Sequence, residues 1–236
     1  IGRLPEPERR RALGALDMGL FANLFFPHYC RTPASGFHRE MYELLGDAVE
    51  SGESRRIAVA APRESAKSTL ATLFLPLWCI CYPEEAGRRF ILIAGDTQSQ
   101  AQQHIGDIKI ELESNPLLAE SFPDLCGAGP VWTREEIVTR NGIKVTSRGT
   151  GGNIRGLRNR QWRPDLLIGD DLENDTNSRT AEQRDKITEW FYKAFSKSAS
   201  KDAVIVVIGT ILHTDSLLSR LLVNPAFRAR KWRGVI

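Results

Sequence analysis

Four short apolar segments constrain the fold of this chain more than any other feature. They occupy Arg56–Ala61, Phe90–Ala94, Asp165–Gly169 and Ala203–Gly209, and Gly, Pro or charged residues bound each of them. Continuous apolar runs of this length are typical of strands that are buried on both faces of a parallel sheet. Because longer segments with helical periodicity separate them, we predict an α/β fold with a mainly parallel sheet flanked by helices.

The segments between these strands predict the helices. Residues 37–50 place apolar side chains three and four positions apart, and residues 6–25 do the same with leucines. Further helices are expected at 68–81, 97–114, 180–198 and 215–223. The dipeptide Asn141-Gly142, between two strand-like segments, predicts a β-hairpin with a two-residue turn.

Length and composition fit a globular protein that needs no membrane. The chain has 236 residues, of which 42% are hydrophobic and 26% charged, and its formal net charge is +3. Its longest apolar run, Leu70–Tyr82, is interrupted by Pro76 and falls short of the roughly 20 residues that span a bilayer. The charged amino end does not resemble a signal peptide, and the four cysteines match no zinc-binding spacing. We assign residues 1–36 to an amino-terminal helical segment and residues 37–236 to the main domain.

A lysine-serine-threonine loop follows the first apolar strand and opens a helix, in the stretch APRESAKST at residues 61–69. A phosphate-binding loop needs this context, because its backbone N–H groups and the helix amino end present positive charge to phosphate oxygens. Lys67 would then contact the β- and γ-phosphates of a nucleotide, and the Ser68 hydroxyl would bind Mg²⁺. Ala61 and Ala66 replace the usual glycines, so a plain helix cap is the alternative explanation of this stretch.

Adjacent carboxylates end the third apolar strand at Asp170 and Asp171, and Glu173 follows. In a Mg²⁺-nucleotide site, one carboxylate holds the metal and a second orients or deprotonates the attacking water. Such acids alone are often solvated loop residues, but together with the lysine-serine loop they indicate a nucleotide site. The strand Phe90–Ala94 lies between the two along the chain.

The fourth apolar strand ends at Gly209-Thr210. Ligands of parallel sheets bind beyond the carboxyl ends of the strands, so a threonine at this position can sense the γ-phosphate. The alternative is a simple exit from strand to turn.

Four segments in this order, APRESAKST, GGNIRGLR, RPDLLIGDDLEN and IGTILHTDSLL, resemble the large subunit of tailed-bacteriophage terminases. The resemblance covers most of the chain, from Phe37 to Leu222, and a phosphate loop with Pro-Arg instead of glycine is usual in that family. It implies a phosphate-loop NTPase of the additional-strand, catalytic-Glu class, which hydrolyses ATP with Mg²⁺ to drive double-stranded DNA into a procapsid. It also implies a portal and a small terminase subunit as partners, a homo-oligomeric ring on the capsid, and a place in the host cytoplasm. We expect the isolated chain to be a monomer.

The resemblance assigns roles position by position. Asp170 resembles the acid on the metal side, with Ser68 as its partner at the metal. The family often places a Glu directly after that Asp; here Asp171 holds the position of the catalytic carboxylate, and Glu173, with its longer reach, stays the alternative. Gly209-Thr210 resembles the motif that couples hydrolysis to movement. The residues that would surround the phosphates are Pro62, Arg63, Glu64, Ser65, Ala66, Lys67, Ser68 and Thr69.

Three arginines and two aromatic residues complete the expected site. Arg63 would reach the γ-phosphate of its own subunit, whereas Arg155, in a Gly-rich segment, would reach the nucleotide of a neighbour and stabilise the transition state there. Arg158 is the second choice, and contact with DNA phosphates or with solvent is the alternative for both. Phe37 and His38 lie where the family packs the adenine; otherwise Phe37 would only fix the entrance to a helix.

The chain begins at Ile1 and ends at Ile236, and we expect it to be a fragment that holds the ATPase part. The carboxyl-terminal nuclease domain of the family, and DNA cleavage with it, would then be absent. Two rival functions are a helicase-like nucleic-acid-dependent ATPase, which would carry a second similar domain, and a nucleotide-binding module that does not hydrolyse ATP. The paired acids oppose the second rival.

Overall fold

One mixed sheet organises the fold in the computed structural model, which describes residues 4–51 and 55–233. Its strand order is β3-β4-β5-β2-β6-β7-β1-β8. The six strands from β5 to β8 in this order run parallel, and β4 and β3 add antiparallel partners beside β5. The predicted α/β fold with a mainly parallel sheet is therefore confirmed. The strands are β1 (Arg55–Ala60), β2 (Phe90–Gly95), β3 (Val131–Trp132), β4 (Glu136–Val138), β5 (Lys144–Gly149), β6 (Leu166–Asp170), β7 (Val204–Gly209) and β8 (Arg228–Lys231).

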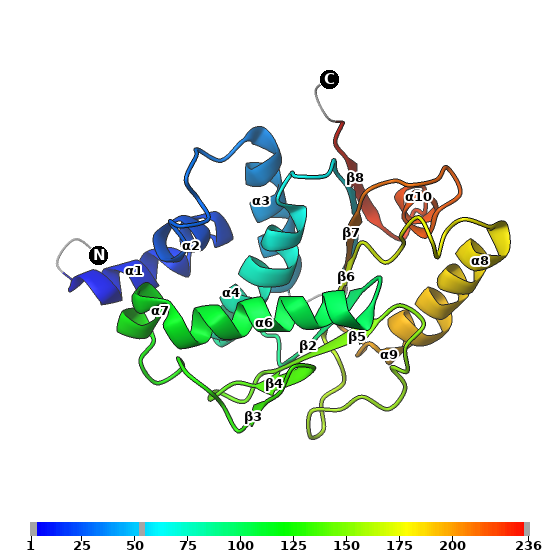
Figure 1. The fold of residues 1–236 in the computed structure, drawn as a ribbon. Helices are drawn as coiled ribbons and strands as arrows, with labels where there is room; N and C mark the ends of the chain where they lie inside the picture. Colours follow the sequence, from blue (N-terminus) through cyan, green and yellow to red (C-terminus); the bar gives the residue numbers. More distant parts are fainter. Residues whose placement is uncertain (1–3, 52–54, 234–236) are drawn as a thin grey trace.

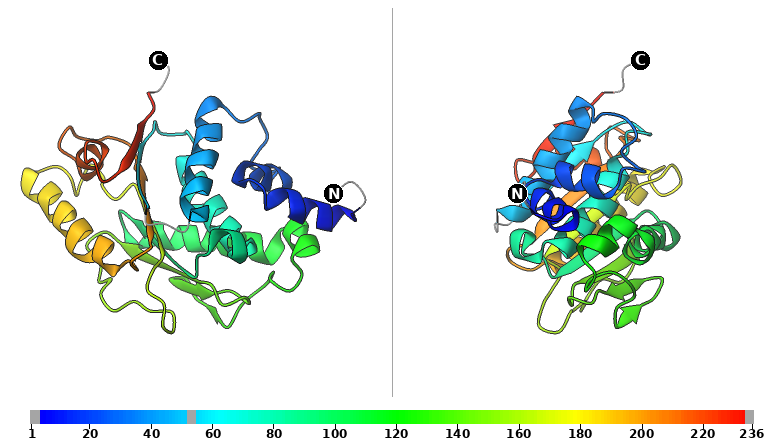
Figure 2. Two further views of the ribbon diagram at one scale, coloured as in Figure 1. Left: turned by 180° about the vertical axis from the view of Figure 1, so that it is seen from behind. Right: turned by 90° about the vertical axis from the view of Figure 1, so that its left-hand side faces the viewer.

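Helices cover both faces of the sheet, which explains why its central strands are continuously apolar (Figure 1). In β2, Ile91 and Ile93 face one core, and Leu92 and Ala94 face the other. The first core is built from α2 (Met18–Phe25), α3 (Gly36–Glu50), α4 (Leu75–Cys81), α5 (Pro83–Ala86), α6 (Gln98–Ser114) and α7 (Pro116–Ser121). Helix α1 (Glu6–Gly14) packs against α2 and α7 at the border of this core. The second core is built from α8 (Ala181–Trp190), the π-helical turn Phe191–Phe195 that follows it, and α10 (Leu217–Leu222). The short helix α9 (Ser196–Ser198) follows this turn and buries no residue. Figure 2 shows the two helical layers from behind and from the side of the amino terminus.

The amino-terminal segment forms two helices where the leucine spacing predicted one. Asp17 has an extended backbone, and its side chain accepts the N–H of Leu20 at 2.7 Å, so the aspartate ends one helical run and caps the next. Phe21 and Phe25 of α2 are fully buried in the same core as Trp78 of α4. The segment is thus packed into the main core.

The helix after the phosphate loop contains a wide π-helical turn, Thr69–Phe74. The turn ends just before Pro76, which has no N–H for the carbonyl of Thr72 and whose ring cannot pack against it in a regular α-helix. The predicted helix at 68–81 therefore forms as two segments of different pitch.

The predicted hairpin forms with a longer turn. Strands β4 and β5 pair antiparallel, and the N–H of Thr139 donates to the carbonyl of Ile143 at 2.9 Å. The N–H of Ile143 donates to the Thr139 hydroxyl instead of its carbonyl, and Gly142 has φ +84°. The two-residue turn was therefore a wrong prediction: five residues, 139–143, connect the strands, and Gly142 has a left-handed backbone within this loop.

Strand β7 lies between β1 and β6 in the sheet, although β2 lies between them along the chain. Ala60 at the end of β1 pairs with Gly209, and Asp170 at the end of β6 pairs with Ile208. The exit of β7 consequently meets the phosphate loop on one side and the acids on the other.

Strand β8 was not predicted, because its sequence Arg-Ala-Arg-Lys is charged. It is an edge strand that pairs with β1 alone, and charged residues suit an exposed edge. Within the described ranges, no helix combines the length and the apolar character needed to cross a membrane.

Candidate nucleotide site

The predicted phosphate loop connects β1 to the π-helical turn at the carboxyl edge of the parallel strands. Glu64 and Ala66 in this loop have φ +64° and +58°, in the left-handed region that favours glycine. Ala66 occupies the position where a phosphate loop usually has its second glycine, so the left-handed turn forms there at some cost in backbone strain.

Two side chains of the loop contact the acids that end β6. Lys67 is buried, and its Nζ lies 3.3 Å from Oδ2 of Asp171. The hydroxyl of Ser68 donates to Oδ1 of Asp170 at 3.0 Å. The two sequence motifs, predicted separately, thus meet in one place.

Asp171 sits in an environment that disfavours its charge. Burial and the neighbouring Asp170 raise the pKa of Asp171, and Lys67 opposes the rise only in part. Its Oδ1 accepts the N–H of Thr210 at 3.0 Å, and its backbone has φ +41°. A Cβ at Gly209 would lie 3.0 Å from that oxygen, so the glycine permits the close approach of β7 to Asp171.

Glu173 has a different set of partners. Its Oε1 accepts the N–H of Leu217 at 2.8 Å, and its Oε2 the N–H of Leu218 at 3.4 Å, so the carboxylate caps the start of α10. Burial raises the pKa of Glu173, and these N–H groups partly offset the rise.

A cleft of about 370 Å³ opens over these groups. It is lined by Arg63, Glu64, Lys67, Asp96, Gln100, Asp171, Glu173, Asn174, Asp175, Thr210 and Leu212. The cleft therefore gathers loop, acids and Thr210 at the edge where a parallel sheet binds ligands.

The residues at the base of the cleft fit a magnesium ion bound with a nucleotide. The Ser68 hydroxyl and the Asp170 carboxylate are hard oxygen donors of the kind Mg²⁺ selects. Oδ2 of Asp170 is buried without a regular hydrogen-bond partner. No cluster of three or more His, Cys, Asp or Glu that could hold a metal occurs among the described residues, and a nucleotide-bound Mg²⁺ needs only one or two carboxylates besides phosphate and water.

Comparison with known proteins gives a fold and no sequence match. No family model matches the chain, and no curated protein matches it. The crystal structure of the HK97 bacteriophage large terminase superposes on 93% of this chain with a TM-score of 0.54 at 17% identity. The large terminase ATPase domain of Thermus phage P74-26 superposes on 85% with a TM-score of 0.51 at 15% identity. The chain has the fold of a large-terminase ATPase domain. It spans 41% of the HK97 chain and 86% of the P74-26 domain.

Of the two residues expected at the adenine of a terminase site, only His38 lies beside the phosphate loop. Its Nε2 is 3.2 Å from the carbonyl of Ser65, and it lines a second cleft of about 210 Å³ that also includes Ala66. Phe37 packs edge-on against Trp232, with ring centroids 5.0 Å apart.

The three arginines that we predicted for the site lie in different places. Arg63 lines the cleft over the acids. Arg155 and Arg158 line a separate basic cleft of about 380 Å³ with Arg163, Lys193 and Lys197. The carbonyl of Arg158 accepts from Lys144, at the start of β5, so this residue lies toward the edge of the sheet opposite the phosphate loop. Neither Arg155 nor Arg158 lines the cleft over the acids.

Several residues of the site were not predicted. Asp96 and Gln100 follow the end of β2, and Asn174 donates to Asp96 at 2.8 Å. Their position beyond the carboxyl end of a parallel strand was the available signal. His104, on α6, contacts Asp170 with Nε2 and Oδ2 3.1 Å apart, and no pattern in the sequence singled it out.

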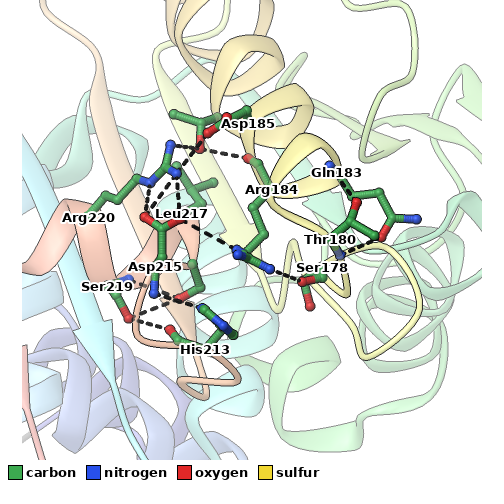
Figure 3. Close-up of polar contacts among 12 residues, drawn as sticks. Ser178, Thr180, Gln183, Arg184, Asp185, His213, Asp215, Leu217, Ser219 and Arg220 are labelled. Atoms are coloured by element: carbon green, nitrogen blue, oxygen red, sulfur yellow. Dashed lines mark hydrogen bonds and ion pairs between the residues drawn. The ribbon is translucent and has the colours of Figure 1, made fainter.

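An ion-pair network fixes the segment that follows β7 (Figure 3). Arg220 donates to both carboxylate oxygens of Asp215, at 2.9 and 3.0 Å, and to Asp185 of α8 at 2.8 Å. Arg184 lies 3.6 Å from Asp215 and donates to the carbonyl of Ser178. The Arg220 contacts lower the pKa of Asp215. The segment between Thr210 and α10 is thereby tied to α8.

Proposed function

We propose that this chain is the ATP-hydrolysing motor domain of a phage terminase large subunit, and that hydrolysis drives double-stranded DNA into a procapsid. The observation that carries the proposal is the meeting of Lys67 with Asp171 and of Ser68 with Asp170 at the carboxyl edge of the sheet. The position of β7 between β1 and β6 supports the additional-strand, catalytic-Glu class of phosphate-loop NTPases.

ATP would bind with its phosphates along the loop from Pro62 to Thr69. Lys67 would leave Asp171 for the β- and γ-phosphates, and Arg63 would approach the γ-phosphate from the rim of the cleft. Ser68 and Asp170 would hold Mg²⁺, which when bound offsets the negative charge that develops on the phosphates. The adenine would lie on the His38 side of the loop.

Asp171 is the carboxylate that we assign to the attacking water. Within the described part of the chain Lys67 is the one partner of its Oδ2, and transfer of this lysine to the phosphates would free that oxygen to orient the water and accept its proton. Its raised pKa makes it a stronger base than an ordinary aspartate. Glu173 is the alternative, but its two oxygens hold the start of α10.

Thr210 would report the state of the nucleotide to the rest of the domain. Its N–H donates to Asp171 and its hydroxyl to the carbonyl of Ala61, so it touches both the acid and the start of the loop. The segment that begins at Thr210 is tied to α8 through Asp215, so a movement of Thr210 would be transmitted to α8.

Arg155, with Arg158 as second choice, would act on the nucleotide of a neighbouring subunit in a ring on the capsid. Arg155 is exposed and does not line the nucleotide cleft of its own subunit, and both observations agree with such a role. We further propose double-stranded DNA, the portal and the small terminase subunit as partners, and the cytoplasm of the infected host as the place of action.

Removing the lysine of the phosphate loop tests the proposal. Lys67→Ala should abolish Mg-ATP binding in calorimetry, because the ammonium group supplies the main charge on the β- and γ-phosphates. Lys186→Ala is the matched control, since this exposed lysine pairs only with Glu182 on the surface of α8. Phosphate release should be measured with and without double-stranded DNA, and packaging with the whole large subunit. Unchanged Mg-ATP affinity in Lys67→Ala would show that the loop does not bind the nucleotide.

A further inference from the structure

One buried histidine contacts the acid on the metal side of the site. His104, on α6, is 9% exposed, and its Nε2 lies 3.1 Å from Oδ2 of Asp170. The N–H direction is off the line of a regular hydrogen bond, so both atoms lack a regular hydrogen-bond partner. Buried polar atoms in native proteins are nearly always paired, and the exceptions call for an explanation at a functional group.

We propose that His104 is a positioning residue for the nucleotide-bound metal, an inference that rests on the proposed ATPase function. It would hold the Asp170 carboxylate so that Oδ1 faces the Ser68 hydroxyl and the metal. Asp170 is 1% exposed, and within the described residues His104 is the one basic side chain paired with it. A carboxylate that binds Mg²⁺ can only accept hydrogen bonds, so the proposal expects a proton on Nε2 of the imidazole.

The other side of the imidazole is linked to the backbone of Ser68 through the Thr72 hydroxyl. Nδ1 of His104 lies 3.1 Å from the Thr72 hydroxyl, and Thr72 donates to the carbonyl of Ser68 at 2.8 Å. The ring therefore stands between the two segments that would supply metal ligands, one at the end of β6 and one at the start of the helix after the loop. Loss of the ring would remove this second link between Asp170 and the Ser68 segment and would leave the direct Ser68–Asp170 hydrogen bond to position both ligands.

A positioning role differs from a purely structural one in what it changes. A structural histidine affects the stability of the fold and leaves the dependence on Mg²⁺ as it was. Removal of groups that hold a metal-ligating carboxylate typically costs 10–100-fold in metal affinity or activity. The affinity for nucleotide without metal should stay constant, because among the described residues the polar partners of His104 are Asp170 and Thr72, and neither belongs to the phosphate loop.

Three substitutions of His104 separate its two contacts. Glutamine places an amide N–H near the position of Nε2 and preserves the contact with Asp170, whereas asparagine reaches only the position of Nδ1 beside Thr72. Leucine removes both. His28→Leu is the matched control, because it breaks another histidine-carboxylate pair whose acid, Glu111, lies on the same helix as His104; the His28 and Glu111 side chains are 3.0 Å apart.

The measurement is binding of a fluorescent ATP analogue during titration with Mg²⁺, with EDTA as the metal-free reference and thermal melting as the check on folding. We expect the Mg²⁺ midpoint to rise about 10–100-fold for His104→Leu and His104→Asn, and only a few-fold for His104→Gln. His28→Leu should match the wild type. Equal midpoints for His104→Asn and His104→Gln would overturn the proposal, even where His104→Leu fails to fold.

A second readout needs neither metal nor nucleotide. In the metal-free protein, the Nε2 proton of His104 should give a protected downfield imidazole signal in nitrogen-edited NMR spectra. The signal should disappear in His104→Gln and shift in Asp170→Asn. An unshifted signal in Asp170→Asn would refute the contact itself. If instead the wild type bound no ATP analogue while this signal behaved as expected, the ATPase proposal would fail and the contact would stand.

Discussion

Asp171 and Glu173 can be told apart by what each does for the fold. Glu173 accepts the N–H of Leu217 at 2.8 Å and, more weakly, the N–H of Leu218 at 3.4 Å. Glu173→Ala leaves both groups at the start of α10 without this acceptor, in a half-buried position. Loss of such a cap costs about 1–2 kcal/mol, and a domain of this size loses about 2–4 °C of Tm for each kcal/mol. We therefore expect the Tm of Glu173→Ala to fall by about 2–8 °C.

Glu173→Gln should behave differently, because the amide oxygen still accepts the N–H of Leu217. The substitution also removes a buried charge whose pKa is raised by burial. The Tm should therefore stay close to that of the wild type, and kcat should change less than about threefold if Glu173 only caps the helix.

Asp171→Asn should show the opposite pattern. Asparagine tolerates the left-handed backbone at φ +41° and removes a carboxylate that burial and Asp170 both disfavour. These gains oppose the loss of the Lys67 ion pair, so the Tm should stay close to that of the wild type. It cannot act as a base, and loss of a general base costs about 10²–10⁴-fold in rate. Mg-ATP binding should persist.

The assay is single-turnover hydrolysis of labelled ATP at high protein concentration, with calorimetry for binding and thermal melting for stability. Single turnover avoids the need for an assembled ring. The reasoning is refuted if Glu173→Gln abolishes hydrolysis with intact Mg-ATP binding while Asp171→Asn retains it. Glu173 would then be the catalytic carboxylate, and its contacts with α10 would describe a resting arrangement.

Three further results are expected. The acid limb of the rate-pH profile should lie above the ordinary aspartate range near 4. A general base must be ionised, and the raised pKa of Asp171 keeps this residue protonated to higher pH. An acid limb at or below the ordinary range contradicts the assignment. Ala66→Gly should leave the free energy of unfolding unchanged or raise it by up to about 1 kcal/mol, because relief of the left-handed strain offsets the extra freedom of the unfolded chain. A clear fall in Tm would contradict strain at this position. Mixtures of Arg155→Ala and Lys67→Ala subunits, assembled on portals, should recover ATPase activity that neither has alone, and mixed assemblies without recovery would place Arg155 outside the neighbouring site.

The sequence alone determined that the sheet is mainly parallel and which two segments form the centre of the candidate site. Continuous apolar runs such as Ile205–Ile208 can be satisfied only where helices cover both faces, so they specified a parallel sheet before any contact was known. The lysine-serine loop and the adjacent acids were recognisable because each is a short local motif at the end of a strand. The loop could be recognised although Ala61 and Ala66 replace its glycines, because the apolar strand before it and the helix after it are both visible in the neighbouring sequence.

The tertiary structure decided what depends on neighbours that are distant in the chain. The order of strands placed β7 beside the phosphate loop, and only then did Thr210 meet both Ala61 and Asp171. Glu173 acquired its cap on α10, and His104 its contact with Asp170, through packing across the sheet. A side chain's sequence position fixes its chemistry, but its partners depend on how whole elements pack, and that packing sums many weak contacts that no short motif records.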